Sequence, residues 1–585
     1  MLTLARVRRV MPLYPVLGLL GAVQALAPAP GPAPAACRSA VYCAGELLQR
    51  VQLARIFHDS KTFVDLKLVH SENDTLADFA VLMRATGGAP SRDQLAHFVT
   101  RHFTDGNELA PWRPPDFDPD PPVLKQIKDE KLRQFAKDII AIWAKLGRKV
   151  SADVKTDPSS YSFLYVPNGI IVPGGRFKEL YYWDSFWIIR GLLLSNMTET
   201  ARGMIENLLY LVDTLGYIPN GSRVYYLGRS QPPLLAATVA SYVAATGDLA
   251  WLQRHLPAVE AELHYWLQHK KATVRVAGAD YVLLRYRADP AARGPRPESY
   301  YEDYTNARVL PDEDSRESFY TELKSAAESG WDFSSRWFVP ADRAPGNITD
   351  VHATRILPVD LNAIFAGALE LAGDFRNRLK DRREAQKWWS LAKYWRGAID
   401  AVLWHEGDGA WFDYDAQAQA PRRHFYPSCA APLWAGAVEP ARAPHYGGRL
   451  LQYLDRSGAL EFPGGVPASM LHSGEQWDFP NAWPPLQSML IGALEASGHE
   501  GARAAARRQA ALWVRANYVG FSTWQKMFEK YDAAAPGRQG GGGEYGVQDG
   551  FGWTNGVALE LLARYGADLA LDEPPAPPPP TVRQT

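Results

Sequence analysis

Cysteine is scarce in this chain, with only three among 585 residues. So few thiols exclude a disulfide-rich scaffold, and no cluster of Cys and His has the spacing of metal ligands. Neither an H-E-x-x-H pair nor a G-x-S-x-G turn occurs, and the glycine run 540–543 lacks the Lys-Ser/Thr that completes a phosphate-binding loop. The sequence therefore predicts no metal and no cofactor.

An excess of charge of either sign is also absent. The chain has 63 Lys and Arg against 64 Asp and Glu, which leaves a net charge of -1. Because nucleic-acid binding requires a basic surface, we expect no nucleic-acid partner. A composition of 46% hydrophobic and 22% charged residues is typical of a globular protein with a large core.

Long apolar runs are missing except at the N-terminus. There, a mostly apolar stretch over 10–27 follows three arginines. It is short for a bilayer span and contains two prolines, so it favours a secretory signal peptide at 1–27 over a membrane anchor. No hydrophobic stretch follows the Pro-rich C-terminal end, as a lipid-anchor signal would require. We expect a secreted protein, with attachment to the cell surface as the alternative, and the oligomeric state stays open.

Between its two ends the chain has the pattern of one domain. Residues 28–39 are rich in Pro and Ala, 572–585 form a Pro-rich tail, and 40–571 contain no clear linker. Helical periodicity dominates this span, at 133–147, 199–216, 233–246, 250–269, 359–373, 379–404, 485–497 and 502–517. We expect an all-α toroid of helix pairs with its loops converging at one end. A helical-repeat scaffold is the alternative, but no fixed period supports it.

A few local features complete this outline. Gly247-Asp248 and Gly373-Asp374 are expected to end helices, and short strands are expected at 281–287 and 409–414. Cys37 and Cys43 are close enough for a small disulfide, which leaves Cys429 as a buried free thiol. Four N-x-Ser/Thr sequons fit secretion, at Asn73, Asn196, Asn220 and Asn347.

Aromatic residues are abundant, with 19 Trp, and they recur beside Arg and carboxylates. The richest segment is 173–187, PGGRFKELYYWDSFW, and similar mixtures occur at 329–337, 474–487 and 529–555. Flat rings cover the apolar faces of a sugar, while Arg and carboxylates bind its hydroxyls. The four clusters therefore predict one sugar-binding pocket built from several loops.

Cleavage of a glycosidic bond needs two carboxyl groups, one as an acid and one as a base or nucleophile. The candidates are Asp184, Glu298, Asp332, Asp478, Glu529 and Glu544. Asp332 follows Trp331, and an apolar wall would keep its carboxyl protonated. The alternative for Asp332 is a helix N-cap before 333–337. Asp478 reads equally well as part of a core turn, and we do not expect it to be catalytic.

The sequence resembles glycoside hydrolase family 37, the α,α-trehalases, and is most similar to the animal secreted or membrane-bound forms. The resemblance covers about 40–570. Segment 173–187 matches one family signature, with Phe186 in place of Tyr, and 476–487 matches a second, with Pro484 in place of Ala. Further matching segments lie at 218–221, 229–233, 294–300, 329–337, 529–532 and 541–556.

This resemblance implies an (α/α)6 barrel that hydrolyses the disaccharide α,α-trehalose to two glucoses with inversion. It places the general acid on Asp332 and the general base on Glu529. It assigns sugar binding to Arg176, Trp183, Asp184, Asn220, Arg229, Ser230, Gln231, Arg296, Glu298, Gly330 and Glu544. The alternatives are another (α/α)6 α-glucoside hydrolase and a catalytically dead trehalose-binding protein.

Four points stay open at this stage. Spacing alone does not separate Glu529 from Glu544 as the base. The glycines 540–543 fit either a flexible surface loop or a lid over bound sugar. Trp183 fits either core packing or sugar contact. Asn220 begins a sequon yet matches a sugar-binding position, and we expect it to carry no glycan.

Overall fold

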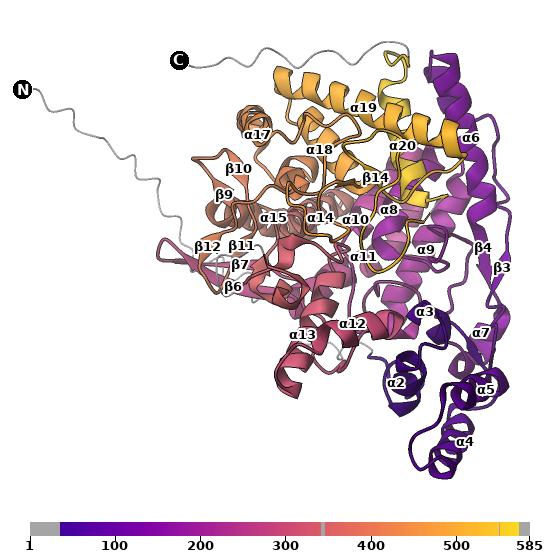
Figure 1. Cartoon of the computed structure of the whole chain (residues 1–585). Coiled ribbons are helices and arrows are strands. Elements are labelled where there is room, and N and C mark those ends of the chain that lie inside the picture. The colour runs from indigo at the N-terminus through magenta and orange to yellow at the C-terminus, as the bar shows by residue number, and fades with distance from the viewer. Residues whose placement is uncertain (1–35, 341–345, 549, 572–585) are drawn as a thin grey trace, which may run out of the picture.

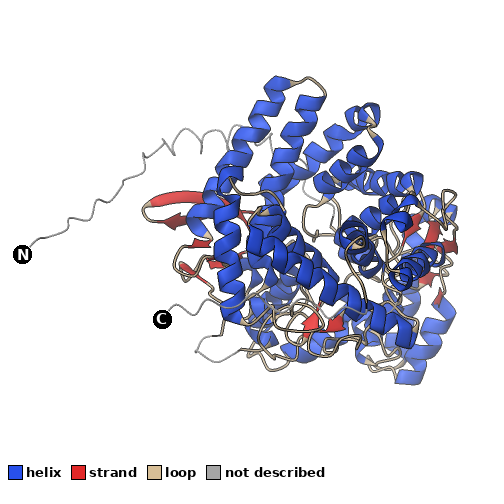
Figure 2. Cartoon of the chain, turned by 90° about the horizontal axis from the view of Figure 1, so that it is seen from above, coloured by secondary structure: helices blue, strands red, loops and turns tan. Residues whose placement is uncertain are grey.

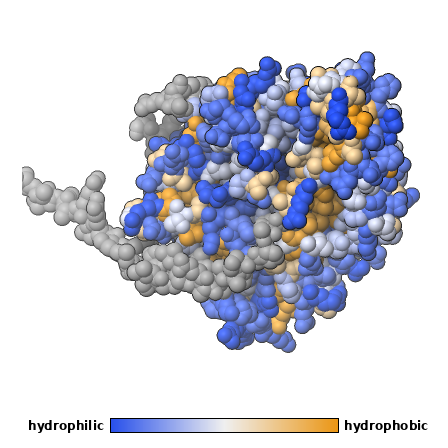
Figure 3. Space-filling model, turned by 90° about the horizontal axis from the view of Figure 1, so that it is seen from below, coloured by the Kyte–Doolittle hydropathy of each residue, from blue (hydrophilic) through white to orange (hydrophobic). Residues whose placement is uncertain are grey.

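The computed structural model describes residues 36–340, 346–548 and 550–571. The expected signal peptide, most of the Pro/Ala-rich segment and the Pro-rich tail lie outside these residues. Helices dominate, and the strands are short (Figure 2). Among the described residues, no helix is both long and apolar enough to cross a bilayer. The face shown in Figure 3 is mostly hydrophilic with small scattered hydrophobic patches.

Six inner helices form a closed ring. They are α8 (Tyr182–Leu194), α10 (Leu235–Thr246), α14 (Val359–Arg378), α16 (Ala431–Trp434), α18 (Pro484–Ala496) and α20 (Gly552–Tyr565). Each contacts the next in this order, and α20 closes the ring against α8. Helices α8, α14, α18 and α20 are buried over most of their length, which agrees with the predominance of apolar residues in them.

Six outer helices alternate with the inner ones along the chain. They are α6 (Glu130–Leu146), α9 (Thr198–Leu215), α11 (Leu249–His269), α15 (Arg382–Val402), α17 (Ala443–Ser457) and α19 (Glu500–Trp524). Helix α6 buries one stripe, including Phe135, Ile139 and Trp143, as expected for an amphipathic helix with one face on the core. It lies beside α20, so the first and the last helix of the toroid are neighbours (Figure 1). The fold is the expected (α/α)6 toroid.

The eight expected helices are confirmed, but two of them continue beyond the expected end: α19 runs to Trp524 instead of 517, and α14 runs past Gly373. Gly247 ends α10 in the left-handed conformation, as a C-terminal glycine does. Gly373 does not end a helix, because α14 continues to Arg378. A Cβ on Gly373 would lie 2.4 Å from Cδ1 of Trp389. This glycine therefore allows α14 and α15 to pack closely. In the sequence, a glycine with this role looks the same as one that ends a helix.

The strands are short hairpins and loop pairings. They are β1 (Lys67–Leu68), β2 (Phe103–Thr104), β3 (Leu109–Pro111), β4 (Gly147–Val150), β5 (Ile170–Ile171), β6 (Lys271–Val276), β7 (Ala279–Leu284), β8 (Ile356–Leu357), β9 (Trp404–His405), β10 (Ala410–Trp411), β11 (Tyr414–Asp415), β12 (Ala420–Pro421), β13 (Asn481–Ala482) and β14 (Tyr531–Asp532). The strand expected at 281–287 is the second strand of the β6–β7 hairpin and ends at Leu284. The hairpin expected at 409–414 pairs β10 with β9.

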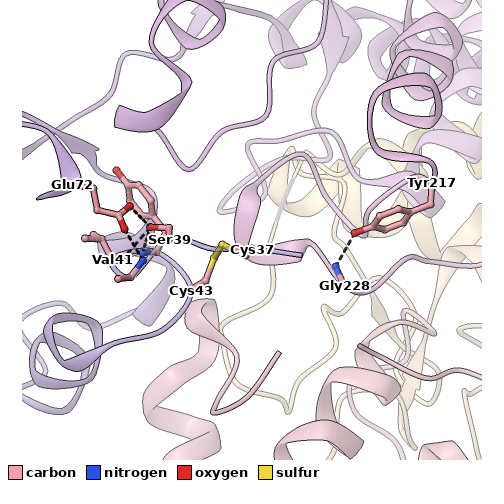
Figure 4. Close-up of a disulfide and its surroundings, with 9 residues drawn as sticks. Cys37, Ser39, Val41, Cys43, Glu72, Tyr217 and Gly228 are labelled. Atoms are coloured by element: carbon pink, nitrogen blue, oxygen red, sulfur yellow. Dashed lines mark hydrogen bonds between the residues drawn. A yellow bond between two sulfur atoms is a disulfide. The ribbon is translucent and has the colours of Figure 1, made fainter. Parts of the chain in front are cut away.

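An N-terminal lobe stands outside the ring (Figure 1). It contains α2 (Glu46–Leu53), α3 (Ser60–Val64), α4 (Glu72–Ala85) and α5 (Arg92–His102) around its own hydrophobic cluster. The Cys37–Cys43 disulfide forms as expected, and Cys429 is a buried free thiol. Next to the disulfide, Ser39 donates a hydrogen bond to Glu72 (Figure 4). Three further helices, α7 (Ala152–Thr156), α12 (Tyr300–Ala307) and α13 (Glu313–Ala327), lie in the loops.

Candidate active site

A cavity opens at the end of the toroid where the inner helices begin. Five of the six connections that lead from an outer to an inner helix contribute to its lining; the α15–α16 connection does not. The cavity has about 670 Å³ of empty space, part of which is open to solvent. Segments far apart in sequence therefore meet in one pocket, as the aromatic clusters predicted.

Nearly all the predicted site residues line this cavity. They are Arg176, Trp183, Asp184, Asn220, Arg229, Gln231, Arg296, Glu298, Gly330, Asp332, Glu529 and Glu544. Ser230 does not line it: its hydroxyl donates to the carbonyl of Ile218 (2.6 Å) and its N–H donates to Glu328 (2.8 Å). Asp478 also lies elsewhere, buried and bonded to Ser334 and Ser335. Its position is that of a core turn, as the sequence allowed.

Asp332 faces the cavity with few partners. Its side chain keeps 36% of its surface accessible, and Nη1 of Arg296 lies 3.9 Å from Oδ2. At this distance the two groups form an ion pair and no hydrogen bond, and among the described residues no side chain donates a hydrogen bond to this carboxyl. Burial raises the pKa of Asp332 to about 7; Arg296 opposes this rise and Glu544 adds to it. Asp332 is not a helix cap, because Ser334 caps the short turn η5 (Ser335–Trp337).

Glu529 lies in a different environment at the start of the 529–550 loop. Its Oε1 accepts a hydrogen bond from the Tyr545 hydroxyl (3.0 Å) and its Oε2 accepts one from the N–H of Gln548 (3.3 Å). Burial raises the pKa of Glu529, but the Lys530 charge and these two donors oppose the rise. Hydrogen bonds to a carboxylate favour its ionised form, so this carboxyl is better prepared for negative charge than Asp332.

Lys530 connects the two carboxyl-bearing segments. Its ammonium donates to Oε1 of Gln476 (2.6 Å), and the Gln476 amide donates to the carbonyl of Asp332. Burial lowers the pKa of Lys530 to about 8, against the attraction of Glu529 and Asp332. The backbone of Asp332 is thus tied to the segment that carries Glu529.

Glu544 has both oxygens engaged. Oε1 accepts from Nη2 of Arg296 (2.7 Å) and Oε2 accepts from the Ser299 hydroxyl (3.0 Å). Arg296 also forms a bidentate pair with buried Asp303. Glu544 therefore holds Arg296 in place, and its surroundings differ from those of Glu529, which accepts from Tyr545 and Gln548.

The glycine run crosses the loop between these two glutamates. The N–H of Gly541 donates to Oδ1 of Asn481 (2.9 Å), and Nδ2 of Asn481 donates to the carbonyl of Gly541 (2.8 Å). Gly542 and Gly543 have φ of 74° and 87°, which only glycine adopts without strain. The loop is held over the pocket by Asn481 at one point and by the Glu544–Arg296 pair at another.

Aromatic rings complete the wall. Trp183 is buried and packs against Trp187, Trp477 and Trp553, so it serves core packing and also faces the cavity. Trp477 and Trp483 stack with centroids 3.8 Å apart. Sequence reasoning singled out neither of these two nor Tyr545, although all three lie inside the aromatic clusters it had marked.

An enclosed, neutral-to-acidic pocket of carboxyls, arginines and aromatic rings on a toroid of helix pairs defines the class of glycoside hydrolases. The comparisons give the particular family. A sequence model of the Trehalase family matches residues 55–566, and the chain belongs to this family.

Known relatives cover nearly the whole chain. It is 50% identical to a trehalase of Bombyx mori over 92% of both chains. It is 44% identical to the trehalase of Homo sapiens, over 96% of this chain and 95% of the human one. Among solved structures, the neutral trehalase of Saccharomyces cerevisiae shares the fold, with a TM-score of 0.55 and 22% identity over 72% of this chain and 82% of the yeast chain.

Proposed function

We propose that this protein hydrolyses α,α-trehalose to two glucose molecules with inversion, with Asp332 as general acid and Glu529 as general base. Family membership and the named trehalases support the substrate. The observation that carries the mechanism is the contrast between two carboxyls on one cavity: Glu529 accepts two hydrogen bonds, while the partly exposed Asp332 carboxyl has Nη1 of Arg296 at 3.9 Å as its nearest cation among the described residues.

The surroundings of Asp332 suit an acid, and those of Glu529 suit a base. A carboxyl with a pKa near 7 stays protonated in mildly acidic solution and can protonate the glycosidic oxygen. Glu529, with donors on both oxygens, accepts the proton of an attacking water. Inversion requires room for this water, with carboxyl groups roughly 6.5–9.5 Å apart. Water attacks one anomeric carbon, the bond to the bridging oxygen breaks, and Asp332 delivers its proton to that oxygen.

The substrate contacts are proposed on the same cavity. Arg176, Arg229 and Arg296 supply N–H donors for hydroxyls, and Trp183 supplies an apolar face. Asn220 is buried and its Nδ2 donates to the carbonyls of Ser230 (3.3 Å) and Ala327 (3.1 Å). Because a glycan would have to attach at this nitrogen, the geometry favours the expectation that Asn220 is unmodified.

Secretion is proposed on the sequence of residues 1–27, together with three exposed sequon asparagines at Asn73, Asn196 and Asn347. Peptide mass spectrometry of the protein from a secreting host tests this. We expect a mature N-terminus after residue 27 and glycan on one or more of the exposed sites. A retained N-terminus would refute the signal peptide.

Proton NMR of the purified protein with α,α-trehalose tests the function. The anomeric signals in the first minutes should show equal α- and β-glucose, because inversion converts one half to β while the other half leaves as α. Early α-glucose alone would mean retention and would make Glu529 a nucleophile. Saturable trehalose binding without turnover would favour the catalytically dead binding protein.

A further inference from the structure

The N-terminal lobe stands outside the helix ring but reaches the wall of the pocket. Its hydrophobic cluster includes Tyr181 and Tyr226, which also line the cavity. Helix α3 packs against the turn η4 (Pro297–Ser299), which carries Glu298. Gln52 of α2 donates to the carbonyl of Pro297 (3.1 Å). The lobe is therefore in direct contact with two segments that bear predicted sugar-binding residues.

Asp59, at the start of α3, makes the most direct connection. Its Oδ2 accepts from Nε of Arg176 (2.8 Å) and its Oδ1 accepts from Nη2 (2.6 Å). Oδ1 also accepts from the N–H of Lys61 (2.9 Å), which caps the helix. The carboxylate is thus fixed by its own helix and grips the guanidinium in the two-bond geometry that sets both position and plane.

Arg176 transmits this constraint into the pocket. The bidentate pair occupies its Nε–Nη2 edge, and within the described part of the chain Nη1 has no hydrogen-bond partner, so its donors can serve a ligand. Its guanidinium lies 4.7 Å from the ring centre of Tyr545, the residue that donates to Glu529. Its backbone N–H donates to Oε1 of Gln548 (2.8 Å), and the Gln548 N–H donates to Glu529.

We propose that Asp59 is a positioning residue for the active site: it orients Arg176 for substrate and, through Tyr545, steadies the carboxylate of Glu529. This inference rests on the proposed function. It gives the N-terminal lobe a part in catalysis that its place outside the toroid does not suggest. The pKa of Asp59 agrees with this pairing: burial raises it, but Arg176 holds it below its ordinary value.

The test uses two substitutions that keep the helix cap. In Asp59→Asn, the amide oxygen can still accept from Lys61 but the charge and one bond to Arg176 are lost; Asp59→Ser keeps a capping hydroxyl and loses both bonds. We expect kcat/KM for trehalose to fall roughly 10- to 100-fold, because a misplacement of about 1 Å costs that much. More of the loss should appear in KM, since Arg176 contacts bound substrate before and during the reaction.

A double-mutant cycle separates positioning from general stability. If Asp59 acts through Arg176, then Asp59→Asn in an Arg176→Gln background should change kcat/KM by less than about threefold. The matched control is Glu72→Gln, in the same lobe, whose carboxylate accepts from Ser39 and the N–H of Ala40 (both 2.8 Å) far from the pocket. This control should keep kcat/KM within about twofold.

Two results would overturn the proposal: wild-type kcat/KM in both Asp59 variants, or a loss that simply adds to that of Arg176→Gln. Failure of the proposed function would look different, since the wild-type protein itself would then not cleave trehalose. In that case trehalose binding by calorimetry, with the same variants and the same cycle, still decides the role of Asp59.

Discussion

Gly330 immediately precedes Trp331 and Asp332, and replacing it with Ala should impair activity more than stability. Its φ is +79°, and a Cβ would lie 3.1 Å from Cε2 and 3.3 Å from Nε1 of Trp183. The left-handed conformation costs a non-glycine residue about 1–2 kcal/mol. Trp183 is 1% exposed and held by other rings, so the crowding must be relieved by shifts of a few tenths of an ångström in the segment that carries Asp332.

Such a shift should lower kcat/KM by about 3- to 10-fold, a fraction of the roughly 100-fold loss per ångström of misplacement. Gly216 provides the matched control: its φ is +81° at the end of α9, and nothing lies within 4 Å of its Cβ position. Gly216→Ala should lose similar stability in thermal unfolding but keep wild-type kcat/KM. If Gly330→Ala behaves like Gly216→Ala in both assays, the contact with Trp183 does not position Asp332.

Further predictions concern the carboxyls and the loop above them. Glu529→Ala should lower kcat at least about 10³-fold, whereas Glu544→Ala should leave measurable turnover; steady-state kinetics showing the reverse ranking would exchange their roles. The alkaline limb of kcat/KM should lie near pH 7, where Asp332 loses its proton. Glu544→Gln should move this limb to lower pH, because it removes a negative charge that raises the pKa of Asp332; an upward shift would contradict the assignment. Gly541→Pro removes the N–H that bonds Asn481 and should lower kcat if the loop is a lid; unchanged kinetics would leave a surface loop.

The sequence predicted the fold best where a residue pattern has a single structural meaning. Apolar helix patterns predicted the toroid because inner helices such as α8 are buried over most of their length. It was wrong at Gly373, since a glycine that ends a helix and one that admits a neighbouring indole look alike in a linear pattern. Resemblance to trehalases placed Ser230 in the site, where the structure turns its hydroxyl to Ile218.

The aromatic clusters predicted that distant segments meet, but the individual side-chain pairings between them could not be predicted. Asp59 lies 117 residues before Arg176, and nothing in its own short helix marks it for the pocket. Tyr545 was inside a marked cluster, but only the fold of the 529–550 loop brings its hydroxyl to Glu529. Pairings of this kind depend on how loops return to one another, and local patterns hold no information about that.

The arginines of the pocket explain why a neutral sugar suits it. Each is neutralised by a carboxylate: Arg176 by Asp59, Arg229 by Glu298, and Arg296 by Asp303 and Glu544. Paired in this way, the guanidiniums offer directed N–H donors without a net positive field that would attract anions. Of the other carboxyls that line the pocket, Glu529 is ionised in its role as the base and adds negative charge, whereas burial raises the pKa of Asp184 and Asp332 and favours their neutral forms. A phosphorylated or carboxylated sugar would meet the Glu529 carboxylate as a like charge and would find no uncompensated arginine among the pocket residues described, so the pocket should discriminate against trehalose 6-phosphate. Competitive inhibition of trehalose hydrolysis by that compound, at concentrations near the KM for trehalose, would show that the arginine charges are less compensated than the ion pairs indicate.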